Sequence, residues 1–135
     1  MIARGVLEVV DDDSKVQIIR ATLHSGETRD RLERLGQYGL TSVPHDGAEC
    51  VVLFPGADNS HGIVIAVEDR RYRLTGLAQG EVALYTDEGD SIQLRRNKEI
   101  EVHTDNFTVF AGSSTLVLNS AGFAVTAPVV NLNST

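Results

Sequence analysis

The chain has 135 residues, enough for one ordinary domain, or for a small domain with an appendage whose core comes from elsewhere. Hydrophobic residues make up 41% and charged residues 23%, a mix that excludes a disordered chain. The formal net charge of −7 argues against binding to nucleic acid, because affinity for the phosphate backbone comes largely from Lys and Arg.

The first predicted element is a β-hairpin formed by residues 4–10 and 15–23. Both segments are rich in β-branched residues that partly alternate with polar ones, and the polar turn DDDS separates them. The acidic run Asp11–Asp13 lies in this turn, and we interpret it as solvated rather than as a cation site.

A short helix or helical turn is predicted for residues 27–36, ETRDRLERLG. Leu32 and Leu35 are three residues apart, which is a helical spacing, and Gly36 offers a helix stop. The following segment, YGLTSVPHDG, has the composition of a loop.

Two strongly apolar strands are predicted in AECVVLFPG and HGIVIAVED, around the turn PGADNS. Cys50, in the first of them, is the single cysteine, so it is interpreted as a core thiol. With a further short strand in GEVALY, the first domain has about five strands and one short helix. These elements predict a small barrel of the OB type, or a related β-sandwich, over residues 1–88.

The segment from Ser91 onward contains apolar pairs, two residues apart, that recur every seven to nine residues. Such a repeat of short strands predicts a β-helix over residues 89–135. A disordered Ser/Thr/Asn tail is the alternative, but it would not keep apolar pairs in near-regular register. The pairs, which we predict to form the core of a trimer, are Ile92/Leu94, Ile100/Val102, Phe107/Val109, Leu116/Leu118, Phe123/Val125 and Val130/Leu132.

The predicted β-helix of residues 89–135, which we call the shaft, is not expected to fold as a single chain. Ordering its backbone costs more free energy than burial of twelve apolar side chains returns. A lone ribbon would also expose one apolar face and two open edges. Three identical chains around one axis would turn every apolar pair toward a dry core, which predicts a homotrimer with an all-β, intertwined triple-stranded β-helix.

Residues 38–94, from YGLTSVPHDGAECVVLFPG to TDEGDSIQL, resemble the baseplate assembly protein V family, the central spike of Mu-like contractile-tailed phages. The resemblance extends upstream through RGVLEVVDDD. It implies an OB-like domain, a triple-stranded β-helix and a homotrimer that caps the tail tube and mechanically pierces the outer membrane of the target cell, without catalysis. The implied partners are baseplate hub and tail tube proteins. The implied location is the baseplate centre of a virion or tail-like particle, after assembly in the host cytoplasm.

Spikes of this family often end in an apex where a His-x-His pair from each of three chains binds iron. This chain stops at NLNST, and His24, His45, His61 and His103 do not have that spacing. No metal or other cofactor is therefore predicted. We expect the apex to be absent, either because the chain is truncated or because the point is supplied separately.

Two other functions remain open at this stage. An OB-type module that binds an oligosaccharide or single-stranded nucleic acid would use the basic patch Arg70–Arg73, although aromatic residues make up only 5%. A trimeric receptor-binding tail fibre would share the shaft but bind a cell-surface oligosaccharide. An enzyme is not predicted, because the acidic cluster at Asp87, Glu88 and Asp90 lies in a turn and no nucleophile elbow or phosphate loop is present.

Overall fold

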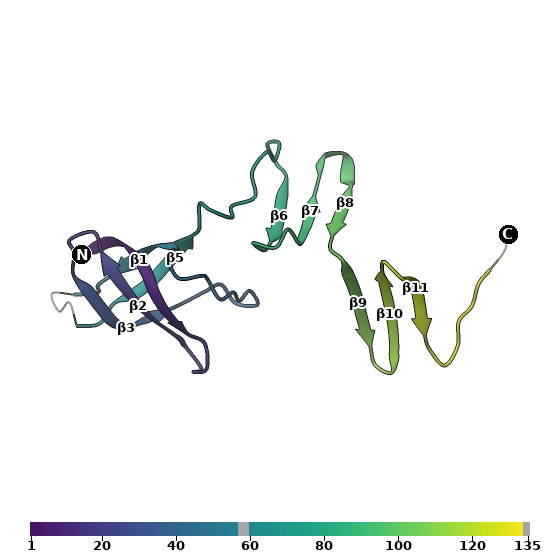
Figure 1. Cartoon of the computed structure of the whole chain (residues 1–135), viewed down its shortest axis with the longest axis horizontal. Helices are drawn as coiled ribbons and strands as arrows, with labels where there is room; N and C mark the ends of the chain where they lie inside the picture. Colours follow the sequence, from purple (N-terminus) through teal and green to yellow (C-terminus); the bar gives the residue numbers. More distant parts are fainter. Residues whose placement is uncertain (57–59, 134–135) are drawn as a thin grey trace. The chain divides into compact units, whose positions relative to one another are not determined.

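The computed structural model describes residues 1–56 and 60–133, and its regular elements are strands apart from one short 3₁₀ turn (Figure 1). The chain divides into two compact units, which we call the barrel unit, Met1–Arg73, and the C-terminal unit, Leu74–Thr135. The predicted all-β class is confirmed. The expected domain boundary at residue 88 lies inside the C-terminal unit.

The barrel unit is a closed five-stranded barrel with the strand order β1-β2-β3-β5-β4. The β3–β5 pair is parallel and the other pairs are antiparallel. Because β1 also pairs with β4, the barrel has no open edge. Its strands are β1 (Ile2–Asp11), β2 (Gln17–Leu23), β3 (Thr28–Arg34), β4 (Glu49–Leu53) and β5 (Ile63–Glu68).

The core of this barrel is apolar and contains the predicted thiol. Leu7, Ile19, Val52 and Phe54 belong to a cluster of apolar side chains that are at most 3% exposed. Cys50 lies in the same cluster as a free cysteine, and its burial raises the pKa of the thiol. The predicted hairpin and the two apolar strands are confirmed as β1–β2 and β4–β5. Part of the turn PGADNS, residues 57–59, lies outside the described residues.

The helix predicted for residues 27–36 is wrong, because this segment forms strand β3. Its Leu32 is buried in the barrel, whereas Leu35 is exposed, so the two do not share a helix face. Arg31 has a left-handed backbone, φ 58°, beside an irregularity in the β2–β3 register. Pairing with β2 and β5 satisfies the backbone of this segment as a strand, so the three-residue spacing of Leu32 and Leu35 does not mark a helix.

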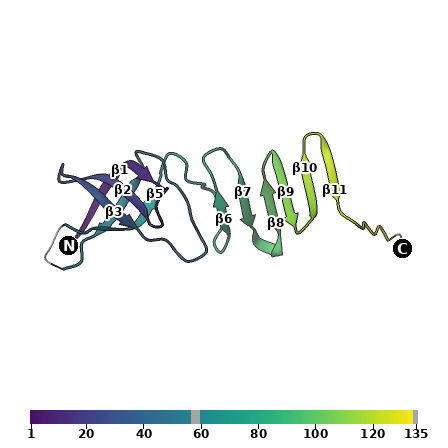
Figure 2. The same ribbon diagram turned by 90° about the horizontal axis from the view of Figure 1, so that it is seen from below.

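The C-terminal unit contains two antiparallel three-stranded sheets, ordered β6-β7-β8 and β11-β10-β9 (Figure 2). The segment GEVALY contributes β6 and pairs with β7, not with the barrel. The 3₁₀ turn η1 (Arg96–Lys98) connects β7 to β8. The strands are β6 (Val82–Tyr85), β7 (Ser91–Leu94), β8 (Ile100–His103), β9 (Asn106–Ala111), β10 (Ser114–Asn119) and β11 (Gly122–Thr126).

Candidate functional site: the apolar faces of the C-terminal unit

The sheet β6-β7-β8 carries apolar side chains on one of its faces. Ile92 lies opposite Leu84 on one side and Val102 on the other. Leu94 lies in the same way between Val82 and Ile100. Because side chains alternate along a strand, these six residues share one face of the sheet.

The sheet β9-β10-β11 repeats this arrangement. Leu118 lies between Phe107 and Phe123, and Leu116 lies between Val109 and Val125. The register therefore brings the predicted pairs of three successive strands into two cross-strand rows on one face. Each sheet of the C-terminal unit thus has an apolar face made of six side chains.

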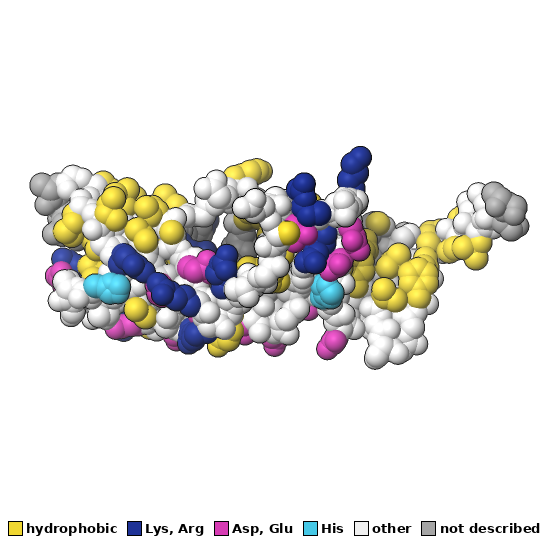
Figure 3. All heavy atoms as spheres, turned by 90° about the horizontal axis from the view of Figure 1, so that it is seen from above, with side chains coloured by type: hydrophobic (Ala, Val, Ile, Leu, Met, Phe, Trp, Pro, Cys, Tyr) yellow, Lys and Arg dark blue, Asp and Glu magenta, His cyan; other side chains and the backbone are white. Residues whose placement is uncertain are grey.

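These faces are not covered within the chain. Ten of the twelve side chains are exposed, by 42–68%; the other two, Phe107 and Leu116, are half-buried. Figure 3 shows hydrophobic side chains at the surface of this unit. Apolar surface of this extent, arranged in regular rows, is characteristic of an interface that awaits a partner.

The opposite face of the sheet β6-β7-β8 is polar and internally bonded. The Arg95 guanidinium donates from Nη1 to Oε1 of Gln93 at 3.1 Å, and its Nε lies 3.9 Å from a carboxylate oxygen of Glu101. The other Glu101 oxygen is 3.0 Å from Nε2 of His103. The sheet is therefore amphipathic, with one face suited to water and the other to burial.

Glu81 anchors the start of this sheet to the β7–β8 connection. Its carboxylate accepts hydrogen bonds from the backbone amides of Ala78, at 2.9 Å, and Arg96, at 3.1 Å, and Arg95 lies 3.6 Å away. The Glu81 side chain is only 6% exposed. These amides, Ala78 first, hold the pKa of Glu81 below its ordinary value.

The structure brings ten of the twelve predicted core residues together, five pairs on two sheet faces. The sixth pair, Val130 and Leu132, is exposed and lies outside any strand. Sequence reasoning missed Val82 and Leu84, which complete the first face. Their signal was present, because they are also an apolar pair two residues apart, ten residues before Ile92/Leu94.

The basic patch of the barrel unit is neutralised by its own acids. Arg71 donates from Nε and Nη2 to the two carboxylate oxygens of Asp69, at 2.9 and 2.7 Å, and this bidentate bond lowers the pKa of Asp69. Arg70 donates to Glu49 at 3.1 Å, and Arg73 lies 3.9 Å from Glu68. Arginines engaged in this way are poorly suited to hold a phosphate backbone.

The described part of the chain has no cluster of three or more His, Cys, Asp or Glu side chains placed to hold a metal ion. The histidines have other neighbours: His103 contacts Glu101, His61 lies 3.7 Å from Glu33, and the His45 ring packs near Tyr72. Within residues 1–56 and 60–133, no helix has the length and hydropathy needed to span a membrane.

Residues 4–71, which form nearly the whole barrel unit, match the family model described as Bacteriophage Mu Gp45, N-terminal. The chain belongs to this family. It is 41% identical over 112 residues to the "Baseplate puncturing device gp45" of Escherichia phage Mu, covering 78% of this chain and 57% of that protein. The "Mu-like prophage FluMu protein gp45" of Haemophilus influenzae is 35% identical over 109 residues, covering 81% and 59%.

The resemblance to the baseplate spike family is therefore confirmed. The chain spans somewhat more than half the length of these curated relatives. The family model covers only residues 4–71, so the apolar faces lie outside the part that it matches.

Proposed function

We propose that this member of the Gp45 family is a structural spike subunit at the centre of a phage baseplate and acts as a homotrimer. The observation that carries the proposal is the pair of regular apolar faces, exposed in a single chain, on the two sheets of the C-terminal unit. The name of the phage Mu relative, a puncturing device, agrees with this role.

Three copies of the chain would bury these apolar faces, which a single chain leaves exposed. If three C-terminal units surround one axis, each contributes one wall of a triangular prism and its apolar rows meet at the centre. The polar face of the sheet β6-β7-β8, with Gln93, Glu101 and His103, then remains in water. This arrangement is the intertwined triple-stranded β-helix expected from the sequence, and its core is continuous and dry.

The barrel unit is proposed to be of the OB type. Its five strands close in the order β1-β2-β3-β5-β4, with the single parallel pair between β3 and β5, which suits the five-stranded Greek-key barrel of that fold. In the spike, this barrel would contact the baseplate hub and tail tube, and the shaft would point toward the target cell.

The action of the spike is proposed to be mechanical rather than catalytic. Force applied along the tail would drive the shaft through the outer membrane, and a strand-paired shaft with a dry core resists bending and unfolding. The acidic cluster at Asp87, Glu88 and Asp90 belongs to a tight turn in which the Thr86 hydroxyl donates to Asp90 at 3.1 Å and the Thr86 amide to the Asp90 carbonyl at 3.0 Å. This bonding supports a structural role for the turn.

Sedimentation equilibrium of the purified chain tests the proposal. We expect a mass three times the 14.6 kDa of one chain, independent of loading concentration in the micromolar range. A folded species of 14.6 kDa would contradict the trimer, since the apolar faces would then be stable in water.

A further inference from the structure

The connection between β3 and β4 carries a second apolar surface, which the proposed shaft does not use. Residues 35–44, LGQYGLTSVP, contain no charged side chain, and we call them the Tyr38 loop. Tyr38 is fully exposed, and Leu35, Leu40 and Val43 are each more than half exposed. Tyrosine is enriched at protein interfaces, and exposed apolar groups that cluster in this way indicate a binding site.

This loop is held in a defined shape. The Arg34 guanidinium donates to the Ser42 carbonyl at 2.6 Å and to its hydroxyl at 2.9 Å, and Gln17 donates to the same carbonyl at 3.2 Å. At the tip, the Leu40 amide donates to the Gln37 carbonyl at 3.1 Å. A loop fixed by such bonds loses little conformational entropy when it binds a partner.

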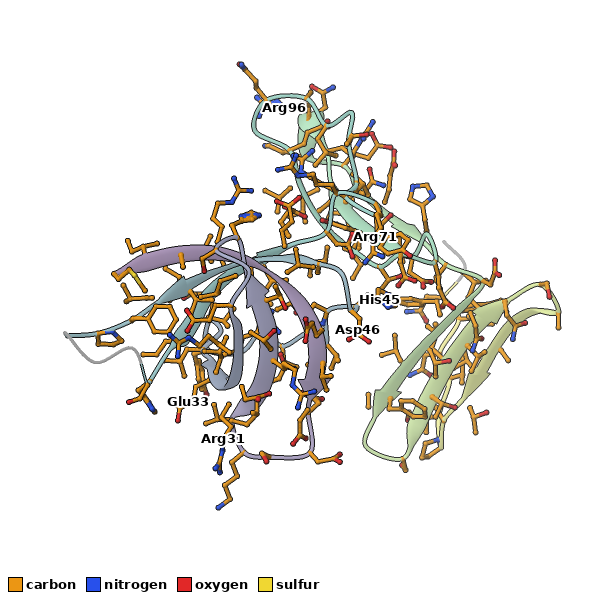
Figure 4. All side chains as sticks on the ribbon, turned by 60° about the vertical axis from the view of Figure 1, so that its left-hand side comes forward. Arg31, Glu33, His45, Asp46, Arg71 and Arg96 are labelled. Atoms are coloured by element: carbon orange, nitrogen blue, oxygen red, sulfur yellow. The ribbon has the colours of Figure 1, made fainter. Side chains whose placement is uncertain are left out.

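The C-terminal end of the loop lies where the chain leaves the barrel. Arg71 donates to the Asp46 carbonyl at 2.8 Å, and the ring of Tyr72 lies 5.4 Å from that of His45. Figure 4 shows Arg71, His45 and Asp46 gathered at this place. The eight residues 74–81 that lead from here to β6 reach at most about 26–29 Å when extended. In a trimer, each barrel is therefore held within this distance of the shared shaft.

We propose that the Tyr38 loop docks onto the barrel unit of a neighbouring copy of this chain, so that three loops join three barrels at the base of the shaft. The inference rests on the homotrimer proposed above. A tethered copy is present at a high effective concentration, so a small contact suffices to hold it. Identical chains with a net charge of −7 repel each other, and a loop without charged side chains adds no local repulsion at the contact.

Site-specific photo-crosslinking on the full chain tests this contact. p-Benzoyl-phenylalanine replaces Tyr38 in one variant and Leu40 in a second, and neither exposed position takes part in the barrel core. The control carries the same group at Ser25, an exposed turn residue just after β2. Gln17, which bonds the Tyr38 loop, lies at the other end of this strand. Each variant is irradiated as the purified protein after its mass has been measured by sedimentation.

We expect the Tyr38 and Leu40 variants to give bands at two and three times 14.6 kDa on a denaturing gel, with crosslinked peptides from the barrel unit. The Ser25 variant should stay at 14.6 kDa. A trimer whose loop forms no crosslink overturns this inference, and so does a loop that crosslinks only to an added baseplate protein or lipid vesicle. In both cases the proposal of a homotrimer is unaffected. Equal crosslinking from Ser25 also overturns the inference about the loop, and a monomeric mass removes both proposals.

Discussion

The barrel unit and the C-terminal unit are both built from short, mostly antiparallel strands with alternating apolar residues, but they protect those residues differently. The barrel core side chains are at most 3% exposed, whereas most of those on the apolar faces of the C-terminal unit are exposed by 42–68%. The barrel closes on itself, and the C-terminal sheets remain open. The same chemistry thus gives one region a buried core and leaves the other with open apolar faces.

The difference follows from how the strands bend. In the barrel, register shifts occur at Leu7/Val9, Ile19/Ala21 and Val51/Val52, and such bulges curve a sheet so that it can close. In the C-terminal unit, the pairings of β6-β7-β8 and β9-β10-β11 run without a shift. Regular pairing keeps the apolar rows aligned on one face and leaves that face open.

The largest effect is expected from Ile100→Asp or Val125→Asp on the apolar faces. Three carboxylates would converge in one dry layer, and each buried charge costs several kcal/mol without a counterion. We expect sedimentation to give 14.6 kDa instead of three times that mass. Ala124→Asp is the matched control, because Ala124 is also exposed on β11 but lies on the other face. A Val125→Asp protein that stays trimeric with an unchanged melting temperature would refute the proposed core.

Phe54→Ala should destabilise the barrel unit and leave the trimer intact. Phe54 is fully buried in the barrel, and its truncation costs about 3–5 kcal/mol of stability. Chemical denaturation followed by circular dichroism should show an earlier barrel transition, and sedimentation should still show the trimer. Loss of the trimer in this variant would mean that the two units do not fold as independently as the division of the chain indicates.

Glu81→Gln should change the pH dependence of the C-terminal unit by a smaller amount. The folded-state pKa of Glu81 lies below its ordinary value, so its carboxylate stabilises the fold above the unfolded pKa, and this contribution is lost as the pH falls through the folded pKa. The melting temperature of the wild-type protein should therefore fall as the pH is lowered from 7 to 3. The variant should have a lower melting temperature than wild type at pH 7 and a smaller decrease toward pH 3. Glu88→Gln, in the β6–β7 turn, is the control and should behave as wild type.

The smallest effect is expected from Arg70→Gln on the barrel surface. Its ion pair with Glu49 is well exposed, and such pairs contribute about 0–1 kcal/mol. Glu49 also keeps its bond to Arg4 at 2.7 Å. Thermal melting should shift little, and a gel shift with single-stranded DNA at physiological salt should be absent in both proteins. Salt-sensitive DNA binding that disappears in the variant would revive the alternative of a nucleic-acid-binding module.

Predictions from the sequence were correct for strands that a local pattern of apolar residues reveals. They were incomplete where the pairing between strands decides the structure. The strands around Cys50 follow from their continuous apolar runs, and the pairs from Ile92 to Val125 follow from alternation with a period of two. The helix expected at 27–36 was wrong, because Leu32 is buried within strand β3 whereas Leu35 is exposed just after the strand ends, so their three-residue spacing marks no shared face.

The amino-acid sequence by itself determined that residues 91–126 contain short strands with apolar pairs on one face, because alternation in a strand depends only on backbone geometry. Only the tertiary structure decided which strands share a sheet. It assigned β6, with Val82 and Leu84, to the C-terminal unit, because β6 pairs with β7 and not with a barrel strand. It also closed the barrel through β1–β4 pairing, because these hydrogen-bond partners lie far apart in the chain.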